Sequence, residues 1–340
     1  MAQSYSFASM RVRMYERDLI TDGQWKRLLA SQDLDQAIQI LKETRYGDLL
    51  EGMDHAENFD QVLQEELAKQ AKLVEDLVEE DALEEFLFLK YDIHNLKVLI
   101  KEFSREGESD EEGEDDNLSS LAYPFGHLFL PDVKEWIREP NRNPKLTDLQ
   151  KATAEGVDIW EETHDAQALD LVLDRWYFKS LDRLSTTLPG RFFPTIVQKL
   201  ADATNILSFF RATRQKLTKD FLARVLVEGG KIPPEDFFKL FGLDQANYGL
   251  FFQKADLGIA FTKALDRYME TGSIAQLERA KDQIQRQSAL EASRYPEGPE
   301  VIYGYLNEVE TEAQNLRILL NGKRLSLPEE EIKERMRTNA

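Results

Sequence analysis

Residues 92–100 read Asp-Ile-His-Asn-Leu-Lys-Val-Leu-Ile, and this stretch decides the fold because the chain contains it in three versions. The second version, Asp-Ala-Thr-Asn-Ile-Leu-Ser-Phe-Phe, occupies residues 202–210, and the third, Glu-Ala-Gln-Asn-Leu-Arg-Ile-Leu-Leu, occupies residues 312–320. Their asparagines stand at positions 95, 205 and 315, so the two intervals between them are equal. A stretch that recurs at a fixed spacing indicates an internal repeat.

The repeated stretch has the apolar spacing of an α-helix. Apolar residues lie at positions −9, −2, +1 and +5 relative to each asparagine, in steps of seven, three and four along one helix face. Asparagine is unfavourable inside a helix, so its presence three times in this face needs a structural reason. The simplest is triplication of a helical lobe that has its own small core.

The spacing predicts three homologous lobes with a period of about 110 residues. We expect helical lobe 1 at 1–105, helical lobe 2 at 119–217 and helical lobe 3 at 218–340. Residues 104–117 are acidic, dotted with glycine and free of apolar side chains. Such a segment cannot bury surface, so we assign 106–118 as a flexible linker in preference to an acidic cation site.

The rest of the chain also shows helical periodicity and no run of alternating strands, which predicts an all-α fold. We expect a long amphipathic helix after Asn58, with a break near Glu80 and Asp81. A second long helix is expected over 257–287. Ser326 and Glu329 are spaced as a capping box and predict the start of a short C-terminal helix.

Composition excludes several classes of protein. The chain has 340 residues, a net charge of −20 and a hydrophobic fraction of 42%. This acidity argues against nucleic acid or anionic lipid as the main partner. Without cysteine there can be no disulfide, thiol nucleophile or cysteine-ligated metal. The N-terminus lacks the features of a signal peptide, and no run is long and apolar enough to span a membrane. We therefore expect a cytoplasmic protein.

No motif predicts catalysis. Gly229-Gly230-Lys231 lacks the spacing of a phosphate-binding loop. The four histidines are scattered, without the spacing of a metal site. With 63 acidic residues, a pair of neighbouring carboxylates says little about acid–base chemistry. We expect no catalytic residue, no cofactor and no metal.

The acidic residue and the asparagine of each version are three positions apart and so share a helix face. The pairs are Asp92 with Asn95, Asp202 with Asn205, and Glu312 with Asn315. One interpretation is a polar patch repeated at three places around an axis. The other, which we favour, is a buried amide that bonds to the backbone of a neighbouring helix and fixes lobe packing.

Basic residues follow each asparagine: Lys97 and Lys101, then Arg211 and Arg214, then Arg317, Lys323 and Arg324. Cations near the C-terminus of a helix are stabilised by its dipole. In so acidic a chain, three matched basic helix ends could equally line a surface that receives an acidic partner. Both interpretations remain open at this point.

Several stretches together resemble one family, the C subunit of the bacterial and archaeal V-type (A-type) ATPases, the counterpart of the d subunit in the eukaryotic vacuolar enzyme. They are Tyr5-Ser-Phe-Ala8, Arg11-Val-Arg13, Thr44-Arg-Tyr-Gly47, Tyr91-Asp-Ile-His-Asn-Leu-Lys97, Glu228-Gly-Gly-Lys-Ile-Pro233 and Glu312-Ala-Gln-Asn-Leu-Arg317. These stretches span the whole chain in order.

The resemblance implies a pseudo-threefold funnel of three lobes between the central shaft of the catalytic head and the membrane rotor ring. Such a subunit turns with the rotor and transmits torque for H⁺ or Na⁺ transport without chemistry of its own. Its partners would be shaft subunits and the cytoplasmic loops of the ring, on the cytoplasmic face of the plasma membrane. On this view the basic helix ends, with Arg11 and Arg13, contribute to the shaft and ring contacts.

Two alternatives come from other classes of protein. A free-standing helical adaptor would bind partner helices in a groove. A carboxylate-dependent hydrolase would need a pocket with strongly shifted carboxyl pKa values. The triplication argues against the hydrolase, because a single active site does not need three matched lobes.

Overall fold

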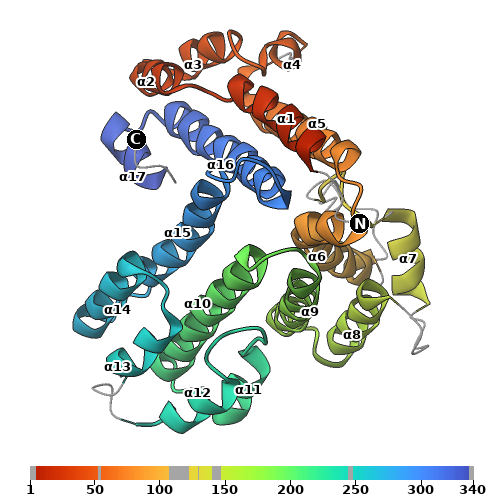
Figure 1. Cartoon of the computed structure of the whole chain (residues 1–340), viewed down its shortest axis with the longest axis vertical. Coiled ribbons are helices and arrows are strands. Elements are labelled where there is room, and N and C mark those ends of the chain that lie inside the picture. The colour runs from red at the N-terminus through yellow and green to blue at the C-terminus, as the bar shows by residue number, and fades with distance from the viewer. Residues whose placement is uncertain are drawn as a thin grey trace. The chain divides into compact units, whose positions relative to one another are not determined.

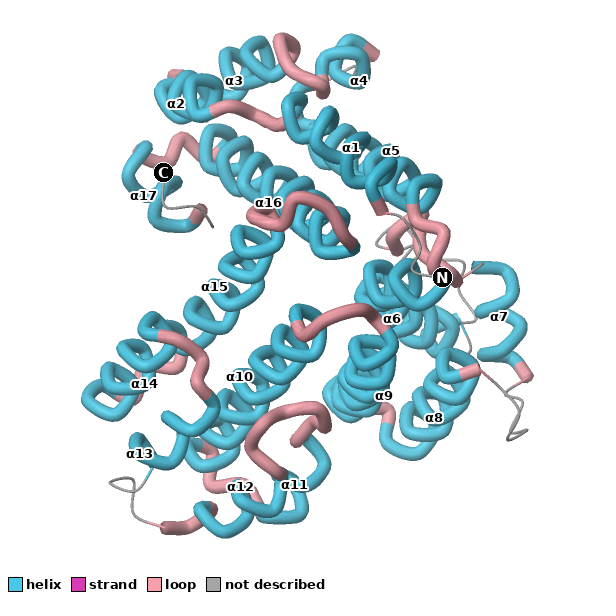
Figure 2. Tube along the Cα trace, in the orientation of Figure 1, coloured by secondary structure: helices cyan, strands magenta, loops and turns pink. Residues whose placement is uncertain are grey.

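The computed structural model describes residues 5–52, 55–106, 122–128, 130–139, 147–243 and 248–336. Within these ranges the chain forms helices, turns and loops and contains no strand, which confirms the all-α prediction (Figures 1 and 2). The predicted linker at 106–118 lies outside the described residues except for its first. The chain divides into two compact units, Met1–Glu79 with Ala289–Ala340, and Glu80–Ser288. The three-lobe division stays a prediction.

The first unit is built around one long helix from the C-terminal part of the chain, α16 (Pro299–Arg324). Its other helices are α1 (Ser6–Tyr15), α2 (Asp22–Ala30), α3 (Leu34–Leu41), α4 (Gly47–Glu51), α5 (Phe59–Leu77) and α17 (Glu329–Arg335). Helix α16 packs against α5, α1, α3 and α17, as Figure 1 shows. Its apolar residues Leu316, Leu319 and Leu320 join the core that α3 and α5 supply. The two ends of the chain are thus folded together.

The second unit contains the remaining helices. They are α6 (Asp81–Glu106), α7 (Leu130–Arg138), α8 (Asp148–Thr163), α9 (Ala166–Thr187), α10 (Phe192–Arg214), α11 (Lys219–Val225), α12 (Pro234–Leu240), α13 (Tyr248–Phe252), α14 (Ile259–Thr271) and most of α15 (Ala275–Ala292). Phe209 and Phe210 of α10 contact Tyr248 and Phe252, and Phe210 lies 4.2 Å from Tyr268 between ring centroids. Offset and edge-on ring contacts of this kind add to the burial of apolar surface.

The long helix after Asn58 is broken as predicted, since α5 ends at Leu77 and α6 begins at Asp81. The continuous helix predicted over 257–287 is wrong. Gly272 ends α14 in the left-handed region, with φ +69°, and its N–H donates to the Tyr268 carbonyl at 2.7 Å. Glycine adopts this conformation without steric cost, so it ends the helix although the apolar periodicity continues.

The capping box predicted at Ser326 is also wrong. The residue before α17 is Pro328, which makes no side-chain capping bond. Ser326 instead ends α16 with φ +54°, and Leu327 N–H donates to the Gly322 carbonyl at 2.9 Å. This six-to-one bond defines a Schellman motif, in which the left-handed residue reverses the chain.

The end of α10 repeats this geometry one repeat interval earlier in the chain. Lys216 has φ +55°, and Leu217 N–H donates to the Ala212 carbonyl at 2.9 Å. The helices that follow, α11 and α17, begin at positions 219 and 329 and end at positions 225 and 335. These offsets equal the interval between Asn205 and Asn315. The recurrence therefore extends from sequence to the local backbone.

Replacing Ser326 by glycine should stabilise the chain, because a side chain at positive φ is strained and glycine is not. The expected gain is about 0.5–1 kcal/mol in the free energy of unfolding, measured by urea denaturation. The matched control is Leu325→Gly at the preceding residue, where φ is −88° and the side chain is 63% exposed. That change should destabilise by a similar amount, and an equal effect of both changes would contradict the assignment.

Candidate functional site

The three repeated carboxylates lie inside the protein and accept backbone hydrogen bonds. Asp92 and Asp202 are fully buried, and Glu312 is 6% exposed. Asp92 accepts from Leu128 N–H at 3.1 Å, and Asp202 accepts from Lys231 and Ile232 at 2.9 and 3.0 Å. Glu312 accepts from Ile20 N–H at 2.6 Å. We call these three carboxylates, with the backbone bonds that they accept, the carboxylate anchors.

Each carboxylate anchor holds the chain at the same place relative to a following helix. Leu128 lies two residues before α7, Ile232 two residues before α12, and Ile20 two residues before α2. Helices α6, α10 and α16 therefore fix the chain just before α7, α12 and α2 respectively. For α16 that helix comes from the N-terminal part of the chain.

Two of the asparagines bond to the loops that the carboxylate anchors also hold. Asn95 accepts from Tyr123 N–H at 2.8 Å and donates to its carbonyl at 3.0 Å. Asn205 does the same with Val227, at 2.8 and 2.9 Å. Tyr123 lies five residues before Leu128, and Val227 lies five residues before Ile232. These amides bond to backbone, as the favoured interpretation expects, although that backbone belongs to a loop and not to a helix. Asn315 is likewise buried.

Glycine permits the close approach of backbone to the two aspartates. A Cβ atom on Gly126 would overlap the Oδ1 of Asp92, and one on Gly230 would overlap the Oδ1 of Asp202. The equivalent position before Ile20 is Asp18, where the anchor is Glu312. Because glutamate is longer by one methylene, it can reach a backbone that stands further away. Glycine thus accompanies the shorter aspartate anchors, and it is absent where the anchor is the longer glutamate.

Burial changes the acidity of the anchors. Burial raises the pKa of Asp92 to about 6, and the backbone N–H of Leu128 offsets only part of this effect. Burial also raises the pKa of Asp202, again against the hydrogen bonds from Ile232 and Lys231. The carboxylates are therefore held in place by backbone donors at a cost in desolvation.

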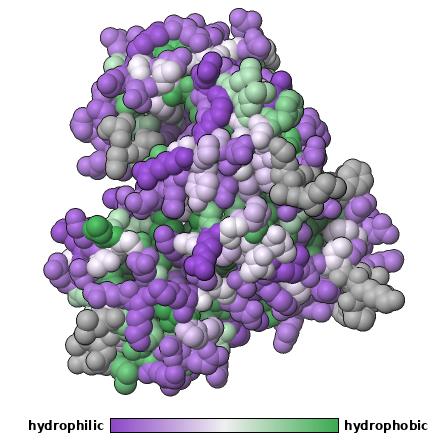
Figure 3. Space-filling view, in the orientation of Figure 1, coloured by the Kyte–Doolittle hydropathy of each residue, from purple (hydrophilic) through white to green (hydrophobic). Residues whose placement is uncertain are grey.

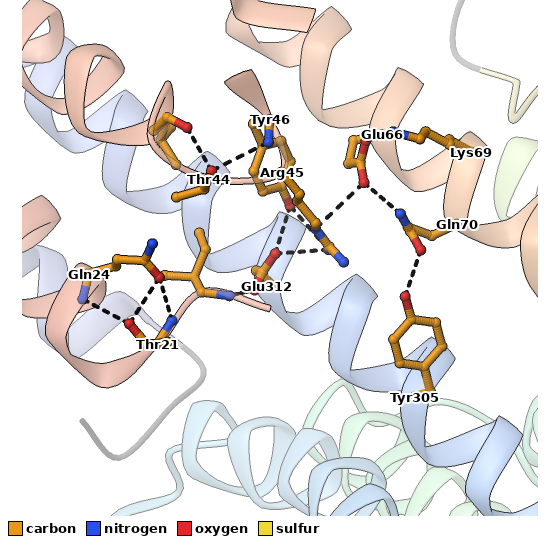
Figure 4. A network of polar contacts seen from close by, with 12 residues as sticks. Thr21, Gln24, Thr44, Arg45, Tyr46, Glu66, Lys69, Gln70, Tyr305 and Glu312 are labelled. Atoms are coloured by element: carbon orange, nitrogen blue, oxygen red, sulfur yellow. Dashed lines mark hydrogen bonds and ion pairs between the residues drawn. The ribbon is translucent and has the colours of Figure 1, made fainter. Parts of the chain in front are cut away.

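The third anchor is part of a larger buried network within the first unit (Figure 4). Arg45 forms an ion pair with Glu312 at 2.8 Å, and its Nε lies 3.6 Å from a carboxylate oxygen of Glu66. Tyr46 O–H also donates to Glu312, at 3.0 Å. Burial alone lowers the pKa of Arg45, but Glu312, Tyr46 and Glu66 together raise it above its ordinary value. This network connects the loop before α4 with both α5 and α16.

The network continues along α5 and α16 and was not foreseen from the sequence. Gln70 donates to Glu66 at 2.6 Å and accepts from the Tyr305 hydroxyl at 2.6 Å. The only sequence signal was the stretch Thr44-Arg-Tyr-Gly47, which carried family resemblance without indicating a role. Distant residues that pair across a core leave no periodic pattern in the sequence.

Most of the basic candidates bond within their own unit. Lys97 and Lys101 of α6 pair with Asp174 and Asp170 of α9 at 2.6 and 2.9 Å. Arg211 pairs with Glu278, and Arg317 pairs with Asp60 at 2.7 Å. Such pairs explain why cations lie at these helix ends, and they do not test contact with another protein.

The other basic candidates differ in exposure. Lys323 is buried and donates to the carbonyls of Leu29 and Ser31 at 2.6 and 2.5 Å. Arg13 donates to two carbonyls at 293 and 295. Arg11, Arg211, Arg214 and Arg324 are exposed, and the side chain of Arg317 is also 42% exposed beside its partner Asp60.

Neither a metal cluster nor a membrane-spanning helix is found in the described part of the chain. No group of three or more His, Asp or Glu side chains there could hold a metal ion. None of its helices is long and apolar enough to cross a bilayer.

Comparison with known proteins decides the family. The model of the family described as ATP synthase (C/AC39) subunit matches residues 8–335. The chain belongs to this family. The match confirms the resemblance drawn from stretches along the whole sequence, and it spans both compact units.

Individual relatives of this C/AC39 subunit are distant but of nearly full length. The C subunit of the V-type sodium ATPase of Enterococcus hirae is 25% identical over 96% of both chains. The C subunit of the A-type ATP synthase of Methanocaldococcus jannaschii is 25% identical, over 97% of this chain and 85% of the relative. The corresponding protein of Methanobrevibacter smithii is 26% identical over 94% and 84%.

Adding a methyl group at Gly230 should destabilise the C/AC39 subunit through contact with Asp202. The change Gly230→Ala should cost about 1–3 kcal/mol in urea unfolding. In an Asp202→Ala background the cost should fall by about 1 kcal/mol or more, because the clash is gone. Gly249→Ala, which meets no atom within 4 Å, is the control and should not destabilise. Equal costs of Gly230→Ala in both backgrounds would contradict the close approach.

The pKa of Asp92 predicts a pH dependence. Its folded-state pKa of about 6 exceeds the ordinary 3.8, so the folded chain binds the proton more tightly than the unfolded chain. The resulting stability is complete below the ordinary pKa and is lost as the pH rises through the folded-state value. Between about pH 4 and about pH 7, the wild type should lose up to about 3 kcal/mol in the free energy of unfolding as Asp92 ionises. The variant Asp92→Asn should not show this loss.

The measurement is the free energy of unfolding of both proteins at each pH. Asparagine keeps an acceptor oxygen for Leu128, so the variant is expected to fold. Glu135→Gln, an exposed carboxyl on α7, is the control and should follow the wild type at every pH. An Asp92→Asn curve parallel to that of the wild type would refute the shift.

Proposed function

We propose that this chain is a non-catalytic central-rotor coupling subunit of a V/A-type rotary ATPase. It seats the central shaft on the membrane rotor ring and transmits torque for ATP-linked H⁺ or Na⁺ transport. The observation that carries the proposal is the family match over residues 8–335, together with relatives named as the C subunit of such enzymes.

The carboxylate anchors support a mechanical role. A torque-transmitting part must keep its helices in register under load. Each anchor joins a long helix to the entry of another by charge-assisted hydrogen bonds in a buried place, where such bonds are stronger than in water. The repeated carboxylates are thus engaged with backbone inside the units and are not free for acid–base chemistry, which supports a non-catalytic role.

We further propose that the three anchors mark three homologous lobes arranged as a pseudo-threefold funnel. The equal offsets between the two Schellman motifs and between α11 and α17 support this. The proposed bounds of the lobes are 1–105, 119–217 and 218–340. The third carboxylate anchor would be completed by the loop before α2, which lies in the N-terminal part of the chain. The funnel would lie on the cytoplasmic face of the plasma membrane, between shaft subunits and the cytoplasmic loops of the ring.

The basic side chains are proposed to contribute to the shaft and ring contacts. Those that bond inside the chain, such as Lys323, would position the helix ends, whereas the exposed arginines would meet acidic groups of a partner. Reversing the charge of Arg214 and Arg324 should weaken assembly at moderate salt without unfolding the chain. Unchanged assembly would exclude these side chains from the interface.

The function is tested by depletion and add-back. The protein is stripped from the solubilised ATPase of the host, and the purified chain is returned. Attachment of the catalytic head to the ring and ATP-driven ion transport should both be restored. If the chain neither binds the depleted complex nor changes transport, the proposed function is wrong.

A further inference from the structure

Helix α1 presents a stripe of exposed apolar side chains. Phe7, Met10 and Met14 are 64%, 55% and 55% exposed. Their spacing of three and four residues places them on one face of the helix. Figure 3 shows apolar surface over α1. We call these three side chains the α1 stripe.

The α1 stripe is unusual within the described residues. Four other large apolar side chains there are more than half exposed, and they are scattered: Leu243, Ile259, Leu290 and Leu325. Single exposed apolar residues are normal on a protein surface, whereas a contiguous group indicates an interaction site. Of the described helices, α1 alone gathers three of them on one face.

The opposite face of α1 is already fixed to its unit. Ala8, Ser9 and Val12 are buried. The Ser9 hydroxyl accepts from Gly298 N–H at 3.1 Å, and Arg13 donates to the carbonyls of residues 293 and 295 at 2.8 and 2.7 Å. The stripe therefore points away from the core that the helix joins, and these contacts hold the helix to its unit.

The residues of α1 itself are basic or uncharged, while Glu16 after the helix pairs with Arg13 and Glu297 accepts from Ser6. Helix α1 contains no acidic residue. Arg11 is exposed, follows Met10 directly, and lies over the Tyr15 ring at 5.3 Å. The chain as a whole carries a net charge of −20. Phe, Met and Arg are enriched at protein interfaces, and methionine adapts its shape to a partner.

The size of the stripe limits its partner. From Phe7 to Met14 the helix rises about 10 Å, or two turns. Such a patch is smaller than the roughly 800 Å² per partner of a stable interface. It therefore suits contact with one helix as part of a larger interface. An anionic membrane fits less well, because the rest of the chain is strongly acidic and would be repelled.

We propose that the α1 stripe docks against a helix of another protein subunit, whose contacting face is apolar and bordered by aspartate or glutamate. This inference rests on the proposed function, since it places the partner within the ATPase complex. The apolar side chains supply the contact area, and Arg11 pairs with the bordering carboxylates.

The test measures binding of purified chain to the depleted ATPase. Replacing Phe7, Met10 and Met14 together by serine should weaken binding at least tenfold. The matched control replaces Leu243, Ile259 and Leu290 by serine and should change binding less than twofold. Arg11→Glu should weaken binding severalfold at low salt, and Arg11→Lys should retain it. All replaced side chains are exposed, so thermal unfolding should be unchanged.

Three outcomes would overturn the proposal. If the wild type binds and the stripe variant binds equally well, the stripe is not an interface, while the proposed function stands. If the wild type does not bind at all, the proposed function fails and this inference fails with it. If the wild type binds protein-free vesicles containing anionic lipid and the stripe variant does not, the stripe contacts membrane and not a protein.

Discussion

A buried carboxylate that accepts a backbone N–H two residues before a helix is the interaction on which both units depend. It joins Asp92 to the entry of α7, Asp202 to that of α12 and Glu312 to that of α2. A loop brought into a protein interior carries donors that must be satisfied. A side chain from a long central helix satisfies them and fixes the direction of the next helix at the same time.

The third version shows how the same constraint is met with different residues. Glu312 replaces aspartate, no glycine lies at position 18 or 19 before Ile20, and Arg45 forms a buried ion pair with the carboxylate. A buried carboxylate beside a buried guanidinium is costly to separate, because either charge alone would remain desolvated. Since Glu312 also bonds to Ile20, this network joins the two ends of the chain.

Much of the fold could be predicted from periodicity, because helices with one apolar face leave a clear pattern. The repeated acid and asparagine were also visible, and burial of the asparagine amide was the favoured interpretation, whereas burial of the carboxylates was not predicted. The break at Gly272 and the role of Ser326 were not, since local backbone conformation competes there with the apolar pattern. The partners of Arg45 and the exposure of the α1 stripe depend on tertiary packing, which no local spacing encodes.

We propose that this subunit turns with the rotor. The most direct measurement is single-molecule observation of its rotation against an immobilised catalytic head. The chain has no cysteine, so one introduced at the exposed Leu290 would carry a probe at a unique site. Rotation of the probe in step with ATP hydrolysis is the predicted result. A probe that stays fixed to the head while the shaft turns would contradict the account.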